Sequence, residues 1–204
     1  MQSFKPRQAS VLALVVFLLS PYAARAGIPS DQLRQTTDKV LAILQDPQFK
    51  SPAKKPERRD RLRQVISARF DFPEMAKRSL GSNWQRLNSE EQRQFVRLFT
   101  DLLERTYSEQ IEAFDGEKIV YGREQQNQDQ AEVDTKIISA KGEAFSVNYR
   151  LLAADRQWKI YDVVIEDVSL VNNYRSQFNR MLVNSSPQDF LRKLREAPAV
   201  KTKG

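Results

Sequence analysis

The stretch EAFSVNYRLLAADRQWKIYDVVIE, residues 143–166, decides the fold. From Phe145 to Leu151, apolar side chains stand at every second position and polar side chains stand between them. This period of two predicts a β-strand with one apolar face. A polar turn at 153–155 then leads into a second strand-like run at 156–166. Because so short a connection cannot cross over a sheet, the two strands must be antiparallel.

Two earlier runs, at 118–124 and 130–140, show the same strand character and are joined by polar turns at 125–129 and 140–142. Short turns between successive strands give a meander. The sequence therefore predicts a four-stranded antiparallel sheet over residues 118–166, with one apolar face.

The segments on either side of the sheet have apolar residues spaced three and four apart, which is typical of amphipathic helices. Ser30 or Asp31 is expected to cap the first helix, and Ser89 with Gln92 resembles a capping box for the longest helix. We predict helices at residues 30–46, 57–70, 73–81, 89–114, 169–182 and 188–195. The expected fold class is α+β, with helices packed on one face of the meander sheet.

The first 26 residues have the layout of a secretory signal. Lys5 and Arg7 precede the unbroken apolar run 11–19, and the small-residue triplet 24–26 follows it. A nine-residue apolar run is about half of the roughly 20 residues that a membrane-spanning helix needs. We therefore expect cleavage after Ala26, with an uncleaved anchor as the alternative, and a soluble exported protein.

The predicted mature chain, residues 27–204, is long enough for one domain with a substantial core. We divide it into a helical part at 30–114, a sheet at 118–166 and C-terminal helices at 169–196, with a disordered tail at 201–204. Without cysteine, this domain must be stabilised by packing and not by disulfides. The net charge of +7 falls to about +4 once the signal is removed, which suits loose contact with anionic lipid surfaces and does not indicate nucleic-acid binding.

Histidine and cysteine are both absent. This excludes the serine–histidine–acid triad, cysteine nucleophiles and zinc sites built on these ligands. Asp162 and Glu166, four apart on a predicted strand, form a carboxylate pair on one face, and Ser139 with Lys141 is a weaker candidate for a dyad. A polar strand edge and a solvated turn are the simpler interpretations. We expect no enzyme activity, no metal and no cofactor.

The run of residues 54–63 contains six basic and two acidic side chains. The simplest interpretation is a solvated helix face. The alternative is a docking patch for anionic headgroups or for an acidic partner protein, because basic side chains gain about 1 kcal/mol each near an anionic membrane.

Two long motifs resemble those of the MlaC family, also known as the toluene-tolerance family. They are WKIYDVVIEDVSLVNNYRSQF at 158–178, and FDFPEMAKRSLGSNW at 70–84 followed by EEQRQF at 90–95. With the export signal, the resemblance covers nearly the whole mature chain. Asp167 departs from it, since the family is expected to place glycine there, and this affects the turn between strand and helix.

The resemblance implies a monomeric carrier of diacyl phospholipid in the periplasm of a Gram-negative bacterium, which maintains the lipid asymmetry of the outer membrane. Its implied partners are an outer-membrane lipoprotein complex and an inner-membrane ABC transporter with an MCE-domain subunit. Acyl chains would lie between sheet and helices. Two chains of about 16 carbons represent on the order of 25 kcal/mol of hydrophobic free energy, so a carrier must keep them from water.

On this basis we predict an apolar lipid pocket enclosed by the helices and the sheet. Its predicted lining comes from the long helix, the third strand and the segment after the fourth strand: Phe99, Leu103, Tyr107, Val147, Tyr149, Leu151, Val163, Val168, Val171, Tyr174 and Phe178. Arg175 is predicted to contact the headgroup phosphate. Periodicity alone cannot separate a cavity lining from a filled core, so two rivals stay open: a periplasmic protein-binding module without a lipid cavity, and a carboxylate-dependent hydrolase.

Overall fold

The computed structural model describes residues 28–114 and 116–197. The predicted signal peptide, residues 1–26, and the predicted disordered tail at 201–204 lie outside these residues. No helix within the two ranges is both long enough and apolar enough to cross a membrane.

The predicted antiparallel meander is confirmed, with a short addition. Within the described residues, the sheet runs in the order β1-β2-β3-β4-β5, and each strand is antiparallel to the next. The first four strands are β1 (Lys118–Asn127), β2 (Gln130–Ile138), β3 (Ala144–Ala154) and β4 (Gln157–Ile165). The fifth strand, β5 (Val168–Ser169), has only two residues and pairs with the end of β4, which corrects the predicted count of four.

A β-bulge between β3 and β4 keeps one face of the sheet apolar. Tyr149 pairs with Val163, but Leu151 pairs with Ile160, so β4 has one residue more than β3 across this interval. An extra residue reverses the side-chain alternation of the bulged strand. Ile160 and Val163 therefore contribute to the same buried cluster, although strict alternation would place them on opposite faces.

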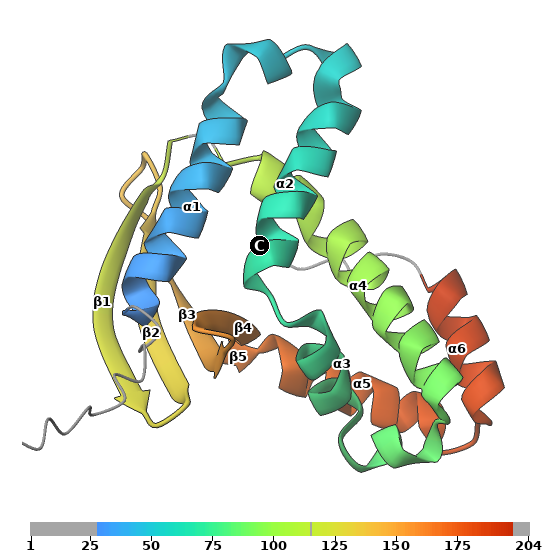
Figure 1. Cartoon of the computed structure of the whole chain (residues 1–204). Helices are drawn as coiled ribbons and strands as arrows, with labels where there is room; N and C mark the ends of the chain where they lie inside the picture. The colour runs from blue at the N-terminus through green and yellow to red at the C-terminus, as the bar shows by residue number, and fades with distance from the viewer. Residues whose placement is uncertain (1–27, 115, 198–204) are drawn as a thin grey trace, which may run out of the picture.

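The predicted helices are present with boundaries shifted by a few residues at most. They are α1 (Pro29–Gln45), α2 (Lys55–Arg69), α3 (Phe72–Leu80), α4 (Ser89–Glu112), α5 (Leu170–Leu182) and α6 (Pro187–Glu196). Short 3₁₀ helices connect some of them: η1 (Pro47–Phe49), η2 (Pro52–Lys54) and η3 (Gly81–Arg86). Figure 1 shows α1 lying across the sheet and α3 to α6 gathered to one side of it.

Two predicted helix caps are wrong by one position or more. The capping box of α4 is formed by Asn88 and Glu91: the Asn88 side chain accepts from the Glu91 amide at 3.0 Å, and Glu91 accepts from the Asn88 amide at 2.9 Å. Ser89 is thus the first helical residue. Neither Ser30 nor Asp31 caps α1, because Pro29 already begins that helix with Ile28 before it.

The buried apolar residues form two clusters. One lies among α3, α4, α5 and α6 and is built on stacked and edge-to-face rings, with Phe95 and Phe178 centroids 5.5 Å apart. The other joins α1, through Leu33, to the apolar face of the sheet, where Trp158 and Ile160 are almost fully buried. Phe70 packs against both clusters. The segment that links α2 to α3 is fixed to the sheet there, since the Asp71 amide donates to the Ile160 carbonyl at 2.8 Å.

Candidate functional site

A cavity of about 260 Å³ lies where the helical cluster meets the sheet. Its walls come from α2, the start of α3, α4, the strands β3 and β4, and the first residue of α5. The uncharged residues that line it are Leu62, Ile66, Ser67, Phe70, Phe72, Met75, Thr100, Leu103, Tyr107, Ser108, Ile111, Tyr149, Val163, Ile165 and Leu170. Most of these side chains are aliphatic or aromatic, so the interior suits hydrocarbon.

Four of the residues predicted from sequence lie in this lining. They are Leu103 and Tyr107 from α4, Tyr149 from β3 and Val163 from β4. Tyr149 and Val163 are paired across the two strands, which places them side by side on the cavity floor. Burial raises the pKa of both tyrosine hydroxyls, with Tyr174 beside Tyr107 adding to the effect there. The phenols therefore bring no charge into the cavity near neutral pH.

The other predicted lining residues lie elsewhere. Phe99, Val171, Tyr174 and Phe178 belong to the helical core cluster, and Val147 and Leu151 belong to the cluster between α1 and the sheet. Val168 is 54% exposed at the turn into β5. The reason is visible on α4, where Phe95, Phe99, Leu103 and Tyr107 follow one another at four-residue spacing and so form one apolar stripe. The part of the stripe with Phe95 and Phe99 packs into the ring cluster, and the part with Leu103 and Tyr107 lines the cavity.

Arg175 does not line this cavity. It lies in a polar depression with Arg78 and Asp162, and its Nε donates to the Arg78 carbonyl at 2.8 Å. Its side chain also lies beside Gly81, the residue with φ of +56° at which α3 ends. The structure thus places Arg175 apart from the apolar lining.

Sequence reasoning missed one whole wall of the cavity. Leu62 and Ile66 of α2, Phe70 of the linking segment, and Phe72 and Met75 of α3 all line it. The sequence of α2 has apolar residues at helical spacing, but the many arginines among them indicate a helix on the protein surface. The available signal was the spacing of Leu62, Ile66 and Phe70, four residues apart, directly before one of the family motifs.

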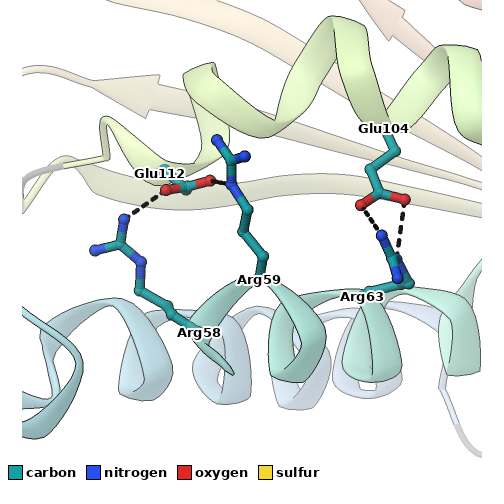
Figure 2. Close-up of polar contacts among 5 residues, drawn as sticks. All are labelled: Arg58, Arg59, Arg63, Glu104 and Glu112. Carbon is teal, nitrogen blue, oxygen red and sulfur yellow. Dashed lines mark hydrogen bonds and ion pairs between the residues drawn. The ribbon is translucent and has the colours of Figure 1, made fainter. Parts of the chain in front are cut away.

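Four charged side chains of α2 and α4 line the cavity where these two helices face each other, and we call this group the mouth: Arg59, Arg63, Glu104 and Glu112. Figure 2 shows the arginines of α2 pointing toward the glutamates of α4. The two nitrogens Nε and Nη2 of Arg63 donate to the two oxygens of Glu104, with the Nε–Oε2 distance at 2.9 Å. Glu112 accepts from both Arg58 and Arg59. The basic run of α2 is therefore not simply a solvated face.

The two mouth carboxylates differ in exposure. The Glu112 side chain is 7% exposed, whereas that of Glu104 is 31% exposed. Desolvation raises the pKa of Glu112, but hydrogen bonds from Arg59 and Arg58 outweigh it, so its pKa lies below the ordinary value of 4.5. The pKa of Arg63 is raised by its bonds to Glu104. Glu112 and Arg63 are therefore both charged near neutral pH.

The candidate carboxylate pair is not assembled. Asp162 is buried and accepts from the Ser169 hydroxyl at 2.6 Å and from the Val171 amide at 3.1 Å. Glu166 lies beyond the end of β4, with φ of 45°, and accepts from the Ser146 hydroxyl at 3.1 Å. The prediction that both carboxylates share a strand face is wrong, because the strand ends at Ile165.

The Ser139–Lys141 candidate is an exposed turn. The Ser139 hydroxyl accepts from the backbone amides of Lys141 at 3.3 Å and Glu143 at 3.2 Å, which is the local bonding of a turn serine. Nowhere in residues 28–114 and 116–197 do three or more acidic side chains gather in a way that could hold a metal ion.

Comparisons with known proteins agree with this architecture. The family model described as MlaC protein matches residues 34–196. A curated relative, the "Intermembrane phospholipid transport system binding protein MlaC" of Haemophilus influenzae, is 24% identical over 165 residues, which span 78% of this chain and 77% of the relative. A solved structure of the phospholipid-binding protein from Ralstonia solanacearum, in complex with a phospholipid, has a TM-score of 0.72 at 24% identity and covers 83% of this chain and 96% of that one. At this identity the solved structure shows a shared fold.

Proposed function

The chain belongs to the MlaC family, and from this premise we propose that it carries phospholipid by enclosing the acyl chains in the cavity between α2, α4 and the sheet. The observation that carries the proposal is the cavity itself. It is lined mostly by apolar side chains, and the charged residues of its lining all lie on α2 and α4. Such a division suits a molecule that has hydrocarbon tails and a charged head.

The size of the cavity bears on how a lipid enters. Sites for drug-sized ligands measure about 300–1,000 Å³. A diacyl phospholipid is larger than such ligands, so a cavity of about 260 Å³ must widen to take both of its chains. Widening is feasible because the walls belong to separate packing units: α4 is part of the ring cluster, whereas α2 packs on α1. A pivot of α2 away from α4, with the bonds from Arg58 and Arg59 to Glu112 kept, would enlarge the cavity without opening either cluster.

We propose that the protein performs no chemistry. The buried carboxylate of Asp162 is held by the Ser169 hydroxyl and the Val171 amide, and the charges at the mouth are paired. A carrier needs neither a nucleophile nor a general base. The names of the relatives describe binding and transport, which supports this proposal.

We further propose that the protein acts in the periplasm of a Gram-negative bacterium. There it would exchange lipid with an outer-membrane lipoprotein complex and an inner-membrane ABC transporter carrying an MCE-domain subunit. The supporting observations are the signal-like first 26 residues and the intermembrane transport system named for the relative. Because a binding protein has no energy source of its own, directional transport would depend on those partners.

The proposal is tested by purifying the mature protein from bacterial cells and measuring its mass under non-denaturing and denaturing conditions. We expect a mass increment equal to one or more phospholipids that is lost on denaturation, and phospholipid in the organic extract. A protein that shows neither, before and after incubation with phospholipid vesicles, would instead be the protein-binding module considered above.

A further inference from the structure

The charged groups of the cavity are all at its mouth. Of the residues that line the cavity, four are charged, and they lie on α2 and α4: Arg59, Arg63, Glu104 and Glu112. With Arg58, which also binds Glu112, this group has three cations and two anions. Its net charge of about +1 is complementary to the single negative charge of a phosphodiester.

The pair formed by Arg63 and Glu104 has the geometry that phosphate recognition uses. Two guanidinium nitrogens of Arg63 donate in parallel to two oxygens of one carboxylate. A phosphate can accept from the same two guanidinium nitrogens through two of its oxygens, which is why arginine binds both carboxylates and phosphates. The two donors that Glu104 occupies therefore also suit a phosphate.

The two ion-paired groups of the mouth differ in how easily they exchange partners. The Arg63 side chain is 56% exposed and Glu104 is 31% exposed, so their interaction is weakened by solvent. Glu112 is 7% exposed and has two arginines, and separating it from them would leave a buried charge unpaired. Arg63 is therefore the arginine of the mouth that can accept a new anion at low cost.

We propose that Arg63 binds the headgroup phosphate of a carried phospholipid, in place of Glu104, while Arg58 and Arg59 stay with Glu112. The proposal rests on the carrier function proposed above. Glu104 then acts as an internal competitor that neutralises Arg63 and must be displaced when a phosphate arrives. Headgroup binding at this place also explains why a solvated, arginine-rich helix forms a wall of an apolar cavity.

Two substitutions give opposite results under this proposal. Arg63→Gln should lower the loading of the delipidated protein from phosphatidylglycerol vesicles by about threefold to tenfold, because one charge-assisted, partly exposed contact is lost. Glu104→Gln should raise loading by about twofold to fivefold, because the competitor is removed. Arg63→Lys should recover part of the loss, because lysine keeps the positive charge but lacks the two parallel donors of the guanidinium group. Loading is measured as phospholipid per protein by mass spectrometry.

If the ion pair served only to hold α2 against α4, both substitutions would change loading in the same direction, and the proposal would be overturned. Arg61→Gln is the matched control. Arg61 lies on the same helix and is 52% exposed, but it pairs with Glu57 and does not line the cavity. It should load as the unsubstituted protein does. An equal loss in Arg61→Gln and Arg63→Gln would mean that the general charge of α2 matters, and not a site.

Diacylglycerol, which has the same chains and no phosphate, separates headgroup binding from chain binding. Its loading should be equal in all variants, and a loss in Arg63→Gln would contradict phosphate recognition. Inorganic phosphate alone should raise the melting temperature of the delipidated protein less than phospholipid does. An equal rise would identify a site for free phosphate. If the unsubstituted protein takes up neither lipid, the carrier function itself fails, whereas normal uptake with no effect of Arg63→Gln rejects only this inference.

Discussion

Arg63 of α2 and Glu104 of α4 both line the cavity and are bonded to each other, with the Arg63 Nε 2.9 Å from the Glu104 Oε2. Together with the bonds from Arg58 and Arg59 to Glu112, this contact joins two helices whose apolar sides both line the cavity. The separation of α2 and α4 therefore sets the width of the cavity, and the same side chains that join these helices also set its charge.

The Glu112 network should make the protein sensitive to acid. Because the folded-state pKa of Glu112 lies below its ordinary value of 4.5, its contribution to stability is present above that value and is lost as the pH falls through the lowered pKa. Glu112→Gln should reduce the free energy of unfolding at pH 7 by about 1–3 kcal/mol, because two arginines lose their shared anion. The same substitution should also make the free energy of unfolding fall less steeply as the pH drops below the ordinary glutamate pKa. Urea denaturation across a pH series measures both effects.

Glu57→Gln provides the control for this prediction. Glu57 is a 43% exposed carboxylate of α2 that also pairs with basic neighbours, Lys54 and Arg61. Its removal should cost far less than that of Glu112, since exposed pairs contribute little. Equal losses in the two variants would mean that the network between α2 and α4 adds nothing beyond ordinary surface charge.

Filling the cavity should block loading without unfolding the protein. Ile66→Trp places a large side chain on the α2 wall of a cavity of about 260 Å³. We expect phospholipid per protein to fall at least about tenfold, a loss of some 1.4 kcal/mol or more in binding, with the circular dichroism spectrum unchanged. Val183→Trp, at a position 75% exposed, is the control and should load normally. Normal loading of Ile66→Trp would place the lipid somewhere else.

Asp162 should prove structural and not catalytic. Its carboxylate is 3% exposed and accepts from the Ser169 hydroxyl and the Val171 amide, which fix the start of α5 to β4. Asp162→Asn should lower the free energy of unfolding by about 1–3 kcal/mol, because an amide cannot accept at both positions. Glu166→Gln, at an exposed position, should cost less. A phospholipid hydrolase activity that both substitutions abolish would support the enzyme alternative instead.

Asp167, where the family is expected to have glycine, should cost the protein little stability. Asp167 has φ of +62°, a left-handed conformation that glycine adopts freely and aspartate adopts at small cost. Asp167→Gly should therefore leave thermal stability about unchanged. Asp167→Val should lower the free energy of unfolding by about 1–2 kcal/mol, since a β-branched residue is strained there. A stable valine variant would show that this turn can relax.

Much of the fold could be predicted from the sequence because its signals are local. Alternation from Phe145 to Leu151 and the short turns of the sheet gave the antiparallel order, and the helical spacing gave the helices. The bulge that brings Ile160 to the same face as Val163 could not be predicted, because an extra residue in one strand is recognised only from its pairing with the neighbouring strand. The cap at Asn88 was missed by one residue because Ser89, an equally good capping residue, follows it.

The cavity was harder to predict than the fold. Leu103 and Phe99 lie one turn apart on α4 and are equally apolar, yet one lines the cavity and the other contacts Tyr174 in the ring cluster. Only the positions of α2 and α5 around α4 decide between them. The arginines of α2 also concealed the cavity wall, because they indicate a solvent-exposed helix. Arg59 and Arg63 belong to the mouth, while Leu62 and Ile66 beside them supply apolar lining.

The central claim is that acyl chains lie between α2, α4 and the sheet, and photo-crosslinking tests it most directly. A phospholipid with a photoreactive group near the end of one acyl chain is loaded and irradiated, and the modified peptides are identified by mass spectrometry. We predict modification of cavity-lining residues such as Ile66, Leu103 and Tyr149. Modification confined to exposed apolar residues such as Val168 and Val183, with none in the cavity, would contradict the account.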